Sequence, residues 1–175
     1  MLQNESTKIL GLRGLMKKNL YAQDYHHAFI YGEKLFNQNP QIDNIYGTLV
    51  SIISKTNNWQ KLIQINERAL KHRLINKEIY SINKSIAFYE ISKIKKFSEI
   101  TESINLIEKA LKLRHYFSPY VSCYIDLLIE NNNLSKAKKY FQKVWAHSPY
   151  PDYKEEIKKL STKMKISFSQ LAEYI

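Results

Sequence analysis

The stretch "AKKYFQKVWAHSP", from Ala137 to Pro149, decides the fold because its spacing recurs near the start of the chain. The proline follows the alanine after twelve residues, with Phe141 between them. The stretch "AFIYGEKLFNQNP" places Pro40 twelve residues after Ala28 in the same way. A small alanine lets two paired helices approach closely, and a proline cannot continue a helix. The spacing therefore predicts the second helix of a helical hairpin at both places.

A period of 34 residues, the length of a tetratricopeptide repeat (TPR), carries this pattern through the middle of the chain. One step forward from the first alanine and one step back from the last reach two positions that are 41 residues apart, one repeat plus seven residues. The extra residues amount to two helical turns, which we place in a long helix at about 77–94. The positions in phase are Ala28, Leu62, Ser103 and Ala137, with later small residues at Ala69 and Ala110.

The sequence predicts an all-α fold, a tetratricopeptide-like right-handed superhelix of about four helical hairpins plus a C-terminal helix. Four glycines and four prolines are too few turn residues for a β-rich chain of this length. We expect one helical-repeat domain, residues 1–175. The predicted hairpins are about 6–40, 43–74, 77–115 and 119–149, followed by a helix at 153–165.

The stretch "ILGLRGLMKKNL", residues 9–20, carries two glycines three positions apart inside an apolar helical pattern. Glycine costs about 1 kcal/mol relative to alanine within a helix, so we expect close helix packing to offset Gly11 and Gly14. A Gly-x-x-Gly clamp for nucleic acid requires a loop in an α/β domain instead. The residues predicted to pack the repeats are Gly11, Gly14, Ala28, Pro40, Trp59, Leu62, Ala69, Ala110, Ala137, Phe141, Trp145 and Pro149.

The first helix of each hairpin builds the inner wall of such an array, where a partner segment binds. A basic, amide-rich wall suits an acidic or carboxylate-ended peptide, since arginine binds carboxylates through two hydrogen bonds. Arg13 fits two roles equally well, as a residue of this groove or as a brace to a buried carbonyl or carboxylate. The predicted groove residues are Arg13, Lys17, Asn44, Ser51, Ser122 and Asp126.

No catalytic or metal-binding pattern stands out, and we expect no enzymatic activity, no metal and no cofactor. The lone Cys123 lies in an apolar helix and forms no cysteine–histidine dyad. The five histidines show neither the His-x-x-x-His spacing nor a cysteine at zinc spacing. Contact of one histidine with haem or a porphyrin stays open without support from the sequence.

The formal net charge is +11, which suits an anionic partner such as nucleic acid or an anionic surface. Lysines occur in nearly every segment, however, so a general compositional bias is the favoured interpretation. In "KAKKYFQK", Ala137, Phe141 and Val144 lie on the packing stripe, and the lysines fall on the opposite, solvated face. Binding of nucleic acid or an anionic surface is therefore the second function considered, after binding of another protein or an acidic peptide segment.

Three stretches of the chain resemble the tetratricopeptide region of the proteobacterial HemY family. The first is "LGLRGLMKKNL", the second starts at Asn58–Trp59, and the third runs from Trp145 to "PYPD" at 149–152. The resemblance covers about residues 7–155. It implies a repeat scaffold associated with haem (porphyrin) biosynthesis, with pathway enzymes as candidate partners.

Members of that family are anchored in the inner membrane by two segments that precede the repeats. The chain as given shows no apolar run of about 18 residues, the length that spans a membrane. We expect a soluble chain, cytoplasmic or peripheral to the inner membrane, that is a fragment, a shortened relative or one piece of a divided protein. The tail "ISFSQLAEYI", residues 166–175, is interpreted as a capping helix or as the start of a further repeat.

Overall fold

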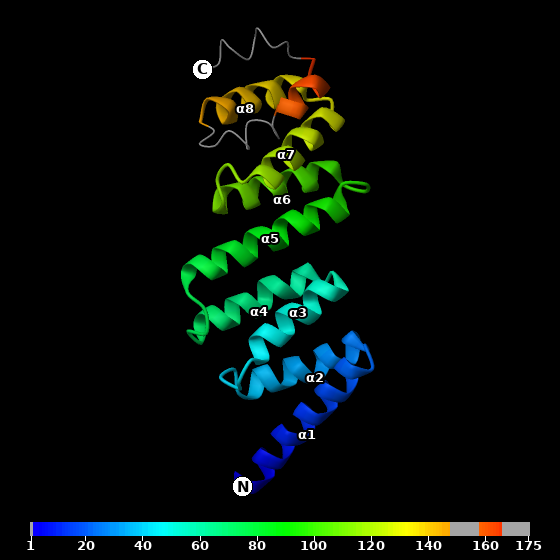
Figure 1. Ribbon diagram of the computed structural model, residues 1–175, viewed down its shortest axis with the longest axis vertical. Coiled ribbons are helices and arrows are strands. Elements are labelled where there is room, and N and C mark those ends of the chain that lie inside the picture. Colours follow the sequence, from blue (N-terminus) through cyan, green and yellow to red (C-terminus); the bar gives the residue numbers. More distant parts are fainter. Residues whose placement is uncertain (1, 148–157, 166–175) are drawn as a thin grey trace. The chain divides into compact units, whose positions relative to one another are not determined.

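The computed structural model describes residues 2–147 and 158–165, and these are helices and turns without a strand (Figure 1). The all-α class and the four predicted hairpins are confirmed as a TPR-like succession of helix pairs. Part of the predicted C-terminal helix is present at residues 158–163, whereas Pro149 lies outside the described residues. The pairs are α1 (Leu2–Tyr21) with α2 (Tyr25–Gln38), α3 (Ile45–Thr56) with α4 (Trp59–Lys71), α5 (Lys77–Lys95) with α6 (Ile100–Leu113), and α7 (Ser118–Glu130) with α8 (Leu134–Ala146).

The chain divides into two compact units, an N-terminal unit, Met1–Ala87, and a C-terminal unit, Phe88–Ile175. The long helix α5 contributes its first half to the N-terminal unit and its second half to the C-terminal unit. Each unit is described by itself below. The single domain of 175 residues stays a prediction.

In the N-terminal unit α2 packs between α1 and α3, and α3 packs on α4. A glycine permits this close approach, but it is Gly32 of α2. A Cβ atom at Gly32 would lie 3.0 Å from Leu49 Cδ2 and 3.2 Å from Met16 Sδ. The predicted role of Gly11 and Gly14 is wrong, because a Cβ at either position would meet no described atom within 4 Å. Both glycines face away from the packed side of α1, where no neighbour offsets their helix propensity.

A buried polar group joins α3, α4 and α5 in this unit. The Tyr46 hydroxyl donates to Asn66 Oδ1 at 2.6 Å, and Asn83 Nδ2 donates to the Tyr46 oxygen at 2.8 Å. Asn66 is fully buried, and its Nδ2 finds no acceptor within the described chain. Burial raises the pKa of Tyr46, and the hydrogen bond from Asn83 opposes the rise. The hydroxyl therefore stays a neutral donor, and the three side chains fix one register of the helices.

In the C-terminal unit α7 packs between α6 and α8 over an apolar core. Phe141, Ile107 and Val121 are fully buried, and Leu160 and Met164 from the last described segment join the same core. Small residues lie at the helix contacts in both units. Ala28, Ala69, Ala110 and Ala137 are fully buried, and Leu62 and Trp145 are nearly so.

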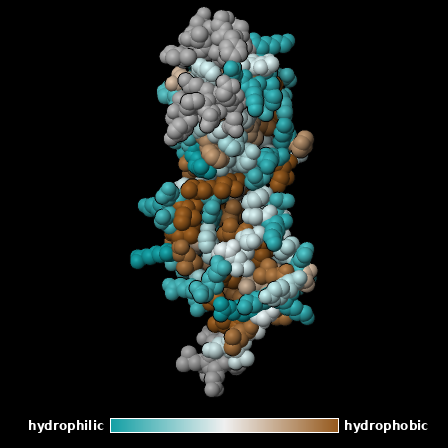
Figure 2. All heavy atoms as spheres, in the orientation of Figure 1, coloured by the Kyte–Doolittle hydropathy of each residue, from teal (hydrophilic) through white to brown (hydrophobic). Residues whose placement is uncertain are grey.

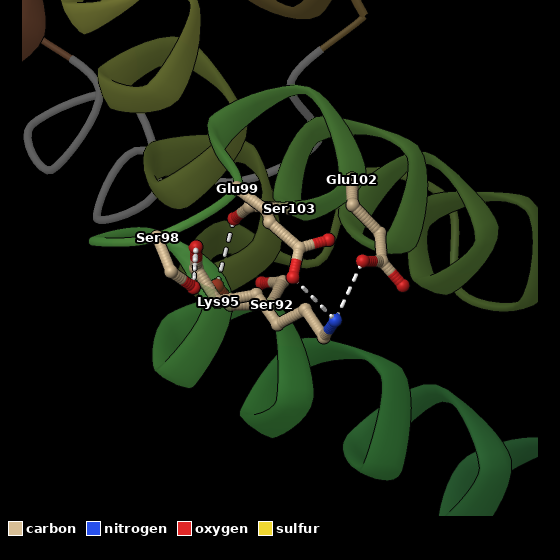
Figure 3. Close-up of polar contacts among 6 residues, drawn as sticks. All are labelled: Ser92, Lys95, Ser98, Glu99, Glu102 and Ser103. Atoms are coloured by element: carbon tan, nitrogen blue, oxygen red, sulfur yellow. Dashed lines mark hydrogen bonds and ion pairs between the residues drawn. The ribbon is translucent and has the colours of Figure 1, made fainter.

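The α5–α6 hairpin has a serine, Ser103, at the position that alanine takes in the first and last hairpins (Figure 3). Its hydroxyl is buried and donates to the carbonyl oxygen of Ser92 at 2.7 Å, so the small polar side chain is satisfied. Beside it, Lys95 Nζ lies 2.6 Å from Glu102 Oε2 and 3.1 Å from Glu99 Oε1 (Figure 3). These contacts fasten the end of α5 to the start of α6.

Candidate functional site

A cleft of about 330 Å³ in the N-terminal unit lies where the end of α1 and the start of α2 meet α3. Its floor is apolar, since Ile52 is buried and Leu20 is half-buried. Its polar groups come mostly from one face of α3, where residues three or four positions apart point the same way. The lining residues are Leu20, Tyr25, Asn44, Gly47, Thr48, Ser51, Ile52 and Lys55.

The cationic end of the cleft is held in place by an aromatic ring. Lys55 Nζ donates to the Tyr25 hydroxyl oxygen at 3.2 Å and lies 4.8 Å from the centroid of the same ring. A cation over an aromatic face gains about 0.5–1 kcal/mol at an exposed site. Within the described chain Lys55 has no carboxylate within ion-pair distance, so its charge is available to a bound anion.

The other end of the cleft is shaped by the turn before α3. Asn44 has a left-handed φ of 58°, a conformation that asparagine tolerates well. A Cβ atom at Gly47 would lie 2.5 Å from Asn44 Oδ1, so the glycine leaves room for this side chain. Thr48 Oγ1 donates back to the Asn44 carbonyl at 2.9 Å. The amide of Asn44 and the hydroxyl of Ser51 are both exposed and offer donors and acceptors.

The predicted groove residues fall at different places. Asn44 and Ser51 line the cleft together, while Arg13 and Lys17 lie on α1 and are not among its lining residues. Ser122 and Asp126 lie on α7 in the C-terminal unit. The Asp126 carboxylate accepts from Lys163 Nζ at 2.8 Å, so a partner would have to replace this ion pair. The groove role of all six residues stays a prediction.

The sequence analysis missed Lys55 and Tyr25. Lys55 follows Ser51 by four residues, so helical periodicity could have placed it on the same face. Tyr25 gave no such signal, because only the packing of α2 on α3 brings its ring beneath the ammonium group.

The described residues give no sign of a metal or redox centre. They include no group of three or more histidine, cysteine, aspartate or glutamate side chains placed to hold a metal ion. His27 Nδ1 contacts Asp24 Oδ2 at 2.7 Å, where the aspartate caps α2. The backbone amide of His27, followed by its side chain, lowers the pKa of Asp24 by hydrogen bonding. Burial raises the pKa of the Cys123 thiol, which disfavours the reactive thiolate.

No protein-family model matches the chain, and no curated protein matches it either. Several solved structures are similar to it at low sequence identity. The crystal structure of a MamA protein is similar at 11% identity and a TM-score of 0.49, covering 95% of this chain and 87% of that one. The structure "MamA 41-end" from Desulfovibrio magneticus RS-1 is similar at 14% identity and a TM-score of 0.43, covering 78% and 73%.

A thermophilic TPR protein of Thermus thermophilus is similar at 12% identity and a TM-score of 0.42, covering 95% of this chain and 87% of that one. These similarities concern the helical fold alone, and the TPR-like description rests on the hairpins above. Membership of the HemY family stays a prediction. Of the helices that the structure describes, none combines the length and the apolar character needed to cross a membrane.

Proposed function

We propose that the protein is a non-catalytic scaffold that binds a polar or acidic segment of another protein in the cleft beside α3. The observation that carries the proposal is the grouping of Asn44, Ser51 and Lys55 along one cleft with an apolar floor. Amide and hydroxyl groups bind a peptide backbone, and an ammonium group without a counter-ion binds a carboxylate.

Affinity enrichment from a cell extract with matched variants tests this site. Ser51→Trp fills the cleft, whereas Ser54→Trp places the same bulk on an exposed position of α3 outside it. Proteins that bind the cleft are recovered with the wild type and with Ser54→Trp and are lost with Ser51→Trp. Recovery of the same proteins by Ser51→Trp, with its far-UV circular dichroism unchanged, would contradict the proposal.

Two further variants ask whether the site extends along α1. Arg13→Glu combined with Lys17→Glu reverses both predicted groove charges, of which Lys17 is exposed and Arg13 is half-buried. Loss of the same proteins as with Ser51→Trp would extend the site to α1. Retention of every partner by a folded variant would remove both residues from it.

The resemblance to the HemY family adds haem-pathway enzymes as candidate partners. Its support is the set of motifs at residues 10–20, 58–59 and 145–152. Identification of the enriched proteins by mass spectrometry tests it directly, because those enzymes would have to be among the proteins that Ser51→Trp loses.

Binding of nucleic acid or an anionic surface is supported by the net charge of +11. Many described lysines are already paired with acidic side chains, including Lys61 with Glu33 and Lys96 with Glu130. Figure 2 shows hydrophilic side chains spread among hydrophobic ones on the visible face instead of gathered in one continuous patch. Nucleic-acid binding predicts an affinity for single strands that falls steeply with salt, and absence of binding at low salt would exclude it.

A further inference from the structure

A second cavity, of about 210 Å³, opens in the C-terminal unit between α6, α7 and α8. Three tyrosines supply much of its wall. The rings of Tyr124 and Tyr140 meet edge to face with centroids 4.8 Å apart, and Tyr116 stacks on His147 at 5.9 Å. Burial raises the pKa of both Tyr124 and Tyr140 to about 12, so both stay neutral at physiological pH. Leu111 completes an apolar interior that a hydrophobic side chain can enter.

The charge at the mouth of this cavity is positive. Glu108 accepts from the Tyr124 hydroxyl at 2.6 Å and from Lys136 Nζ at 3.0 Å, so its carboxylate is already satisfied. Burial raises the pKa of Glu108, but these two hydrogen bonds outweigh burial and the net pKa is lowered. Two more lysines, Lys112 and Lys143, line the cavity. Within the part of the chain that the structure covers, neither lies within ion-pair distance of a carboxylate.

The corresponding place in the N-terminal unit is bridged. Residues 75 positions earlier are Asn37 for Lys112 and Arg68 for Lys143. Arg68 Nη1 donates to Asn37 Oδ1 at 2.6 Å, which joins α2 to α4 across that place. Two lysines repel each other and cannot form such a bridge, so the C-terminal unit keeps this place open with two uncompensated cations.

We infer that this cavity binds the aromatic side chain of a partner protein segment whose neighbouring aspartate or glutamate residues pair with Lys112 and Lys143. A volume of about 210 Å³ is below the ~300–1,000 Å³ of common small-molecule sites, which suits one inserted side chain. Aromatic walls also attract cations, but the two ammonium groups oppose a cationic ligand. The site shares the scaffold role of the proposed function, yet it uses other residues in another unit.

Fluorescence anisotropy with labelled peptides tests the inference on the full chain. The probe carries one phenylalanine between pairs of glutamates, and two control peptides replace the phenylalanine by alanine or the glutamates by glutamine. We expect each control to bind about tenfold more weakly or worse, which corresponds to about 1.4 kcal/mol. Equal binding of the phenylalanine and alanine peptides, or no binding of the probe at millimolar protein, would overturn the inference.

Matched protein variants locate the binding. Lys112→Asn combined with Lys143→Arg installs the bridge of the N-terminal unit while keeping one cation, and it should weaken the probe about tenfold. Lys143→Glu should also weaken it, whereas Lys139→Glu, an exposed position on the same helix outside the cavity, should change affinity by about twofold or less. Equal effects of Lys143→Glu and Lys139→Glu would contradict the site.

One further variant separates this inference from the proposed function. Ser51→Trp blocks the cleft of the N-terminal unit and should leave binding of the phenylalanine probe unchanged. Loss of the probe with Ser51→Trp would place it in that cleft, which overturns the inference and leaves the proposed function standing.

Discussion

The N-terminal and C-terminal units place corresponding residues 75 positions apart, and several of these residues have the same role in both. Lys61 Nζ lies 3.4 Å from Glu33 Oε1, and Lys136 Nζ lies 3.0 Å from Glu108 Oε1. Each pair links the second helices of consecutive hairpins. Before those helices, Asn57 and Asn132 adopt left-handed φ values of 53° and 55°. The turn and the ion pair therefore belong to the repeat, whatever the core contains.

The units differ in the side chains that fill this shared register. Fully buried Asn66, the centre of a polar group in the N-terminal unit, corresponds to fully buried Phe141 in the apolar core of the C-terminal unit. Leu49 and Ile65 correspond to the tyrosines that wall the second cavity. The difference shows that a repeat can keep its backbone while a few substitutions decide whether a place is closed or open to a ligand.

Truncation of the two buried counterparts should give the largest effects. Phe141→Ala removes a fully buried ring and should lower the free energy of unfolding by about 3–5 kcal/mol. Asn66→Ala leaves the Tyr46 hydroxyl without its acceptor and should cost about 1–3 kcal/mol. Urea unfolding followed by circular dichroism measures both. A larger loss for Asn66→Ala would reverse the comparison of the two cores.

Alkaline pH should weaken the C-terminal unit through its tyrosines. Tyr124 and Tyr140 have a pKa of about 12 in the folded chain, above the ordinary value of 10 that applies after unfolding. The folded state therefore holds more protons between pH 10 and 12, so stability falls as pH rises through that window. Tyr124→Phe combined with Tyr140→Phe should flatten this fall, measured by urea unfolding at a series of pH values. An unchanged slope in the double variant would contradict the raised pKa values.

Substitution of the glycines separates the packed face of α1 and α2 from the exposed one. Gly14→Ala meets no described atom within 4 Å and should raise the free energy of unfolding by roughly 0.5–1 kcal/mol. Gly32→Ala gains the same helix propensity but crowds Leu49 and Met16, so it should be less stable than Gly14→Ala by about 1 kcal/mol. Thermal unfolding ranks the two variants. A higher stability for Gly32→Ala would show that these side chains relax freely.

The repeated ion pair should give the smallest effects. Glu33→Gln and Glu108→Gln each weaken one partly exposed pair, worth about 0–1 kcal/mol. The loss at Glu108 should be the larger of the two, because the Tyr124 hydroxyl also donates to this carboxylate. Chemical unfolding of both variants in low and high salt tests the order, and equal losses would remove the extra role of Tyr124.

The helical hairpins could be predicted from the sequence because their signals are local. Ala28, Ala137 and Pro40 mark close helix contacts and a helix end by their own chemistry, and the 34-residue step depends only on counting. The role of Gly32 could not be predicted in this way. All three glycines lie inside helical patterns, and only the packing of α2 against Met16 and Leu49 distinguishes the useful one.

The candidate sites were less predictable. Asn44 and Ser51 followed from the phase of the repeat, whereas Tyr25 comes from another helix and carries no periodic signal. The second cavity depends on a comparison between repeats. An arginine and an asparagine bridge one unit, two lysines leave the other open, and neither outcome is visible before the helices are paired.

The most direct test of this account is a titration of the isotope-labelled chain with the Glu-Glu-Phe-Glu-Glu peptide, followed by amide chemical shifts. The account predicts the largest shifts at Leu111, Lys112 and Lys143, with little change at the bridged counterparts Asn37 and Arg68. Shifts of equal size in both units, or shifts confined to the N-terminal unit, would contradict it.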